Sequence, residues 1–407
     1  MIVEGKIVNH DSEIYGQIQL NEQTGIIENV GENLGAPDIK TTGLIFPGFI
    51  DLHVHTRVDA SGKELYKEDL ETATAAAIRG GVTHVADMPN NPVPPIDDDS
   101  YKKKKELFAA SPIDVTLYAG IGPETEPLSA RAPYKVFLAR PPVGELFLVS
   151  KQAVETAMEK YRGQFVSFHA EDAEILQQNE SAVSHESRRP VSAEQAAIDF
   201  VISLTEKYQL HSKICHLSTT AGLEAIKTAK ARGLDITVEA APHHLYFDET
   251  MLTEQNRKWL QMNPPLRTRE DRLALIAGLK NGDIDFLATD HAPHSPEEKQ
   301  KGMSGVPHLD TYGPFITWLM GEHGFTVRDI ARVCSFNPGK FVNEFNQYKF
   351  GKIEPRYAGS LTIINPATSI TINKKDLKTK CAWSPFENLT FPGRVTHTIV
   401  RGKVYAQ

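Results

Sequence analysis

Cysteine is scarce in this chain, which has three in 407 residues. Cys215, Cys334 and Cys381 are widely spaced and odd in number, which argues against a disulfide framework and against a zinc knot built from thiolates. We therefore interpret all three as small, buried apolar side chains.

Long apolar runs are also absent. No stretch of eighteen apolar residues occurs, and the charges of Glu4 and Lys6 stand too early for the core of a signal peptide. The formal net charge of −8 gives no reason to expect nucleic acid or an anionic membrane as a partner. We expect a cytoplasmic protein.

The remaining composition is that of a globular protein, with 40% apolar residues, 28 Gly and 25 Pro. The length suits one large α/β barrel with an appended module, or two to three ordinary domains. Both ends read as short strands between turn signals, at residues 2–8, 15–20, 25–30, 359–366 and 395–404. We predict one small β-sandwich formed by both termini, from residues 1–47 and 355–407, because domain termini often lie close together.

The middle of the chain, residues 48–354, alternates between apolar strands and helical stretches. Eight strands are expected at residues 50–55, 82–88, 114–121, 134–139, 165–170, 213–217, 235–240 and 286–289. Helices are expected between most of them, at residues 69–79, 150–162, 192–208, 222–232 and 269–280. This alternation predicts an α/β fold, a (β/α)8 TIM-type barrel, whose chemistry gathers at the carboxyl ends of the strands.

Four of these strand ends carry residues that bind metals. His53 and His55 are two apart in a strand and so project from the same face, and His169, His216 and Asp290 end three later strands. Imidazole and carboxylate ligands without thiolate suit Zn²⁺, with Mn²⁺, Co²⁺ or Fe²⁺ not excluded. Five such ligands exceed the need of one open tetrahedral ion, so we predict two ions about 3.5 to 4 Å apart with an anionic bridge.

Lys135 stands at the matching place on the fourth strand. A lysine beside two cations would be neutral, and a neutral amine can add CO₂ to form a carbamate with two bridging oxygens. The alternative is an ordinary lysine at a strand end, paired in a salt bridge.

Motifs along the whole chain resemble the amidohydrolase superfamily and, within it, the dihydroorotases. The motifs are Asp51-x-His53-x-His55-x-Arg57, Tyr66 to Leu70, Gly80 to Thr83, Met88-Pro89-Asn90, His169 to Asp172, His216 to Thr219, Glu239 with Pro242 to Leu245, Asn263 to Arg267, and Thr289 to His294. The resemblance implies a binuclear zinc centre with His53, His55 and Asp290 on one ion and His169 and His216 on the other. It also implies a carboxylated Lys135 and a hydroxide between the two ions.

The same resemblance implies a binding site for a substrate carboxylate, formed by Arg57, Asn90 and His294, with Asn263 as a contact to the substrate ring. An arginine offers a two-donor fork to a carboxylate, and Asn and His add neutral donors around it. The alternative for each of these four is a loop residue that caps backbone groups.

The implied reaction is the reversible cyclisation of N-carbamoyl-L-aspartate to L-dihydroorotate in pyrimidine synthesis. In the hydrolytic direction two ions supply hydroxide and polarise the ring amide, and Asp290 passes a proton to the leaving ring nitrogen. One alternative is a hydantoinase, dihydropyrimidinase or allantoinase, which generally lacks an arginine at the place of Arg57. Another is a non-catalytic scaffold for a partner such as aspartate transcarbamoylase. The family also suggests a homodimer.

Overall fold

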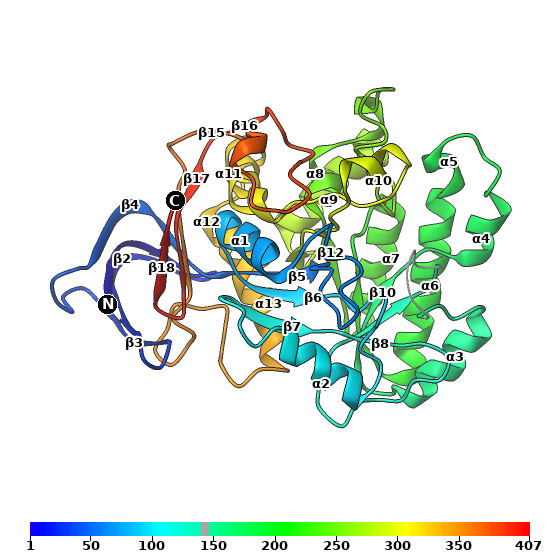
Figure 1. Ribbon diagram of the computed structural model, residues 1–407, viewed down its shortest axis with the longest axis horizontal. Coiled ribbons are helices and arrows are strands. Elements are labelled where there is room, and N and C mark those ends of the chain that lie inside the picture. Colours follow the sequence, from blue (N-terminus) through cyan, green and yellow to red (C-terminus); the bar gives the residue numbers. More distant parts are fainter. Residues whose placement is uncertain (140–145) are drawn as a thin grey trace.

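Both ends of the chain form one β-rich unit in this computed structural model, which describes residues 1–139 and 146–407. Seven strands pair in the order β18-β17-β14-β4-β1-β2-β3, so C-terminal and N-terminal strands share one sheet (Figure 1). They are β1 (Ile2–Val8), β2 (Glu13–Asn21), β3 (Ile26–Gly31), β4 (Ile39–Pro47), β14 (Leu361–Asn365), β17 (Arg394–Val400) and β18 (Lys403–Ala406). A small additional sheet pairs β15 (Ile370–Thr371) with β16 (Thr390–Phe391). Strands from the two termini therefore lie next to one another in one sheet.

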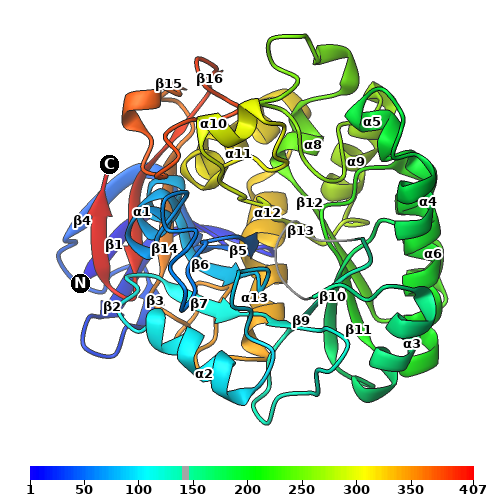
Figure 2. The ribbon, with the colours of Figure 1, turned by 45° about the vertical axis from the view of Figure 1, so that its right-hand side comes forward.

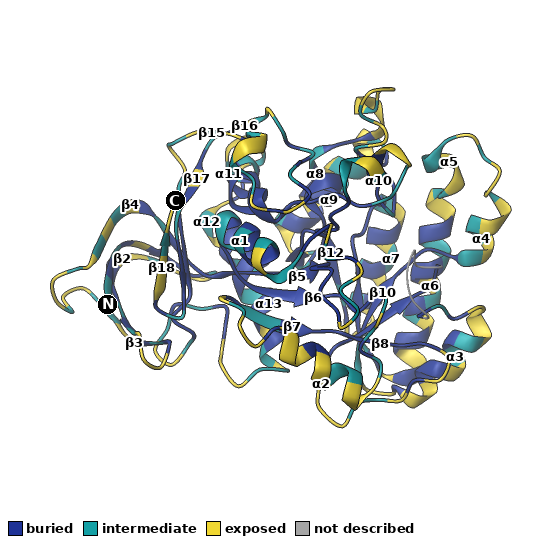
Figure 3. Cartoon of the chain, viewed as in Figure 1, coloured by how far each residue is buried: buried dark blue, intermediate teal, exposed yellow. Residues whose placement is uncertain are grey.

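The middle of the chain contains parallel strands at all eight predicted places. They are β5 (Phe49–Val54), β6 (Val82–Asp87), β7 (Asp114–Leu117) with β8 (Ala119–Gly120), β9 (Tyr134–Phe137), β10 (Phe165–His169), β11 (His211–Ile214), β12 (Ile236–Ala240) and β13 (Phe286–Leu287). They pair as two parallel sheets, β5-β6-β7 and β13-β12-β11-β10-β9-β8. Most of their residues are buried, as expected for parallel strands covered on both faces (Figure 3).

Helices surround these parallel strands (Figure 2). They are α1 (Leu70–Gly80), α2 (Asp98–Leu107), α3 (Lys151–Lys160), α4 (Ala173–Gln178), α5 (His185–Arg188), α6 (Val191–Tyr208), α7 (Thr220–Ala231), α8 (Pro242–Tyr246), α9 (Arg269–Asn281), α10 (Pro296–Gln300), α11 (Tyr312–His323), α12 (Val327–Ala331) and α13 (Asn337–Asn343). No helix in the described ranges is long and apolar enough to cross a membrane.

Local sequence explains where α1 begins and ends. The Asp69 carboxylate accepts a hydrogen bond from the Thr72 N–H at 2.9 Å, which satisfies a free donor of the first turn. Gly81 ends the helix at φ 83°, a left-handed conformation that glycine adopts without steric cost. The chain can then enter β6 directly.

The first and last parallel strands meet. Val54 and His291 form a parallel bridge, and the His55 N–H donates to the His291 carbonyl at 2.8 Å. Below them the buried Asp51 carboxylate accepts the Thr289 N–H at 2.9 Å. These contacts bring the carboxyl ends of β5 and β13 side by side.

Candidate metal centre and substrate pocket

All ten residues predicted for the site line one pocket at the carboxyl ends of the parallel strands: His53, His55, Arg57, Asn90, Lys135, His169, His216, Asn263, Asp290 and His294. They come from six strands or the segments just after them and from the connection before α9. Six further residues that were not predicted for the site also line the pocket: Phe137, Ala139, Arg189, Ala292, Ser304 and Gly305.

The first group of metal-type ligands is His53, His55 and Asp290. The Nε2 atoms of both histidines lie 3.2 Å from Oδ1 of Asp290. Ligands about 2 Å from a tetrahedral zinc ion lie about 3.3 Å from one another, so these three side chains could hold one ion.

A second group adjoins the first. Nδ1 of His169, at the end of β10, lies 3.0 Å from Nε2 of His216, which follows β11. The rings of His53 and His216 are 5.3 Å apart between centroids. Two imidazole nitrogens that face each other at this distance suit a second cation.

Burial sets the charge state of these ligands. It lowers the pKa of His53, His55 and His216 well below the usual range, and the neighbouring cations Lys135 and Arg57 add to this for His53 and His55. Neutral imidazoles keep the lone pair that a metal needs. Burial raises the pKa of Asp290 to about 7.

The backbone is strained where it presents site residues. Arg57, His216 and Asp290 have φ of 63°, 37° and 49°, in the left-handed region that residues other than glycine rarely adopt. Each such residue costs on the order of 1 to 3 kcal/mol. The surrounding fold bears this cost at three positions of one pocket.

Two buried carboxylates orient the histidines, and neither was predicted from the sequence to have a role. Glu239, in β12, contacts Nδ1 of His53, accepts the His216 N–H at 3.2 Å and pairs with the Lys213 ammonium. Nε2 of His53 is thereby left to face Asp290. A carboxylate behind a ligating histidine fixes both its tautomer and its ring orientation.

Glu171 does the same for the second group. It contacts Nε2 of His169 at 2.7 Å, so Nδ1 of that ring faces His216. The Nε of Arg189 donates to Glu171 at 3.0 Å and holds the carboxylate in place. Glu171 lies two residues after His169 in a motif already noted, but nothing in the sequence indicated Arg189.

Lys135 is fully buried in β9, and its Nζ lies 2.8 Å from Sγ of Cys215. Among residues 1–139 and 146–407, no carboxylate forms a salt bridge with it, which disfavours the alternative of a paired lysine at a strand end. Cys215 is free and buried, as predicted. It also lies close to His53 and Glu239 in a group with metal-type spacing, although Lys213 already pairs with Glu239.

The other end of the pocket carries polar atoms without a partner. In the described part of the chain, Nε of Arg57, Oδ1 of Asn90 and Oδ1 of Asn263 are buried and make no hydrogen bond. Buried polar atoms normally have a partner, so this arrangement favours contact with a polar ligand over capping of backbone groups.

The sequence profile of the amidohydrolase family matches residues 44–405. The chain belongs to the amidohydrolase family. It is 33% identical to the dihydroorotase of Pyrococcus furiosus, covering 99% of this chain and 92% of that protein. It is 31% identical to the dihydroorotase of Lactobacillus acidophilus, covering 100% and 98%. The resemblance predicted from the motifs is confirmed.

Among solved structures, the L-hydantoinase (dihydropyrimidinase) of Arthrobacter aurescens superposes on this amidohydrolase with a TM-score of 0.89, over 100% of this chain and 96% of that one. At 23% identity the likeness shows a shared fold.

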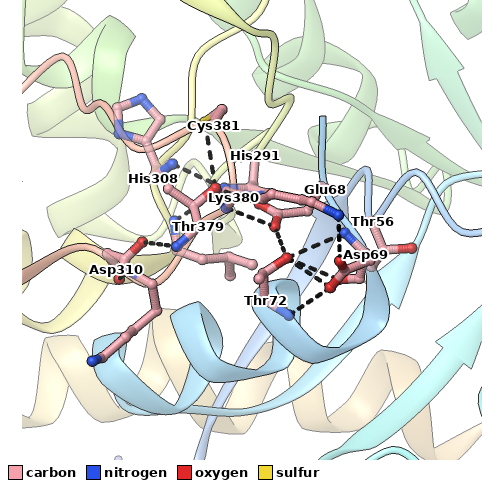
Figure 4. A network of polar contacts seen from close by, with 12 residues as sticks. Thr56, Glu68, Asp69, Thr72, His291, His308, Asp310, Thr379, Lys380 and Cys381 are labelled. Atoms are coloured by element: carbon pink, nitrogen blue, oxygen red, sulfur yellow. Dashed lines mark hydrogen bonds and ion pairs between the residues drawn. The ribbon is translucent and has the colours of Figure 1, made fainter. Parts of the chain in front are cut away.

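A polar network joins this amidohydrolase pocket to the end of the chain (Figure 4). The buried Glu68 carboxylate faces Nε2 of His291 at 3.2 Å and accepts the Lys380 N–H at 3.0 Å and the Thr379 hydroxyl. His291 directly follows Asp290. Indole Nε1 of Trp383 donates to the His294 carbonyl at 2.8 Å, so the C-terminal segment supports the wall of the pocket.

Proposed function

We propose that this chain is a dihydroorotase, which interconverts N-carbamoyl-L-aspartate and L-dihydroorotate in pyrimidine synthesis. The observation that carries the proposal is the placement of Arg57, with Asn90 and His294, in the same pocket as two groups of metal-type ligands. The substrate has a carboxylate beside the cyclic amide, and these three residues would bind that carboxylate. Full-length relatives named dihydroorotase support the same choice.

We further propose two zinc ions. His53, His55 and Asp290 would hold the first, His169 and His216 the second, and a carbamate on Lys135 would bridge them; the neutral histidines and their carboxylate partners fit this role. When bound, the ions would lower the pKa of water and polarise the ring amide.

The chain's own residues would position the substrate and move the proton. Arg57 would donate two parallel hydrogen bonds to the substrate carboxylate, and Asn263 would contact the substrate ring. Asp290 would take a proton from the attacking water and pass it to the ring nitrogen, and the reverse reaction uses the same path.

The finer architecture is also a proposal. The contacts between β5 and β13 support closure of the parallel strands into a (β/α)8 barrel over residues 48–354. A bridge between Ile26 and Ala358 returns the edge strand β3 to the segment before β14, which supports a sandwich built from residues 1–47 and 355–407. A cytoplasmic location and a homodimer stay predictions.

The test is an assay of the purified protein on L-dihydroorotate, hydantoin and allantoin, with zinc analysis. We expect turnover of dihydroorotate alone and close to two zinc ions per chain. Turnover of hydantoin or allantoin without dihydroorotate would overturn the choice of substrate. A folded protein with no bound metal and no activity would indicate a scaffold.

A further inference from the structure

Glu298 lies outside the predicted site but reaches back to it from α10. Its Oε2 lies 3.2 Å from Nδ1 of His294, one helical turn earlier, and also accepts the Ser295 N–H at 3.0 Å. Ser295 in turn caps the helix by accepting the Glu298 N–H. The capping box therefore fixes the carboxylate beside the imidazole ring.

A second segment holds Glu298 from the opposite side. The Tyr66 hydroxyl donates to Oε1 at 2.6 Å, and Nζ of Lys67 lies 3.2 Å from the same oxygen. Burial opposes ionisation, but the hydrogen bonds from Tyr66 and Ser295 lower the pKa of Glu298 to about 2. Glu298 is therefore a fixed anion.

The ring of His294 has its proton on the side of Glu298. Nη2 of Arg57 lies 3.4 Å from Nε2 of His294, and a guanidinium can only donate, so Nε2 accepts and Nδ1 carries the hydrogen. From the sequence, His294 is expected to be a neutral donor to the substrate carboxylate. In this tautomer a neutral ring has no N–H left for a substrate.

A protonated His294 ring could still donate to a substrate, because an imidazolium donates from both nitrogens. Burial and then Arg57 and Lys67 lower the pKa of His294 to about 2, with Lys299 acting in the same sense and Glu298 opposing. An anionic substrate beside Nε2 adds the second negative charge that would favour the cationic ring.

We propose that Glu298 is a positioning residue for substrate recognition: it orients His294 and balances its charge, so that Nε2 donates to the substrate carboxylate. On binding, Nε2 takes up one proton from solvent, Arg57 turns its N–H groups to the same carboxylate, and Glu298 stays ionised. This inference rests on the proposed function, because it requires a substrate with a carboxylate.

The test compares Glu298→Gln with Glu297→Gln, a matched control on the same helix whose side chain is exposed. In Glu298→Gln we expect the KM for L-dihydroorotate to rise at least about tenfold, the effect of losing a hydrogen bond to a charged group. We expect kcat to stay within about threefold of wild type, as for a loss of uniform binding. Bound metal per chain should not change, and Glu297→Gln should match wild type.

A neutral analogue separates positioning from general damage. The carboxamide of L-dihydroorotate lacks the anion, so its inhibition constant should be the same for wild type and Glu298→Gln. Tyr66→Phe, which removes one donor to Glu298, should raise the KM in the same direction but less.

An unchanged KM in Glu298→Gln, or equal weakening of substrate and carboxamide, would overturn the inference while leaving the enzyme a dihydroorotase. A wild-type protein that does not turn over dihydroorotate would instead refute the proposed function, and this inference with it.

Discussion

The ion pair between Lys213 and Glu239 gives a stability prediction that can be worked out from its burial. Both side chains are 1% exposed. Lys213→Met keeps the length of the side chain but removes the ammonium. Glu239 then remains as a buried anion whose other contacts are the ring of His53 and the N–H of His216.

Removing one partner of a buried pair costs about 3 to 5 kcal/mol, because the remaining charge is left without compensation. Unfolding entropy is about 2.1 cal/mol/K per residue, which for 407 residues is about 0.85 kcal/mol/K. Lys213→Met should therefore lower the Tm by about 4 to 6 °C. Adding Glu239→Gln removes the stranded charge, so the double variant should recover most of the loss.

Differential scanning calorimetry of chelator-treated protein measures this without the contribution of bound metal. Lys227→Met is the control, because Lys227 pairs with Glu224 on the surface and such pairs contribute little. If Lys213→Met and the double variant showed the same decrease in Tm, the stranded charge of Glu239 would not be the reason for the decrease. A loss as large in Lys227→Met would also contradict the reasoning.

Four further predictions concern the site and one buried acid. Asp290→Ala should lower kcat on dihydroorotate by about 10² to 10⁴, the usual value of general acid–base catalysis, and unaltered turnover would contradict its role. Arg57→Met should raise the KM for dihydroorotate by about 10- to 100-fold in steady-state assays, because a charge-assisted pair is lost. Chelation should abolish turnover and added Zn²⁺ should restore it, with metal content followed by elemental analysis. Burial raises the pKa of Asp310 to about 6, so the stability that its proton provides is lost as the pH rises through that value. The Tm of Asp310→Asn relative to wild type should thus be higher at about pH 7.5 than at about pH 4.5, and a pH-independent difference would argue against the shift.

The sequence predicted the parallel strands and the candidate ligands because both signals are local. An apolar run followed by one histidine or aspartate marks a strand end, and the order of strands and helices brings such ends to one edge. His53 and Asp290 are far apart in the sequence, but the alternation alone was enough to place them in one pocket.

The partners of these ligands could not be predicted in the same way. Glu239 contacts His53 across 186 positions of the chain, and only the packing of the strands selects it among the other acidic residues. Arg189 lies in a short connection after α5 without any motif. Glu298 is different, because its spacing of four from His294 at a helix start is a signal that the sequence alone carries.

Thr379 and Lys380 donate hydrogen bonds to Glu68, and the indole of Trp383 donates to the carbonyl of His294. The C-terminal segment is therefore part of the architecture of the proposed active site. A fragment that ends at residue 354 would keep every proposed ligand. It would lose the hydrogen bonds from Thr379 and Lys380 that hold Glu68 against His291, the residue after Asp290. Transfer of this pocket to another protein would therefore require residues 379–383 as well as residues 48–354.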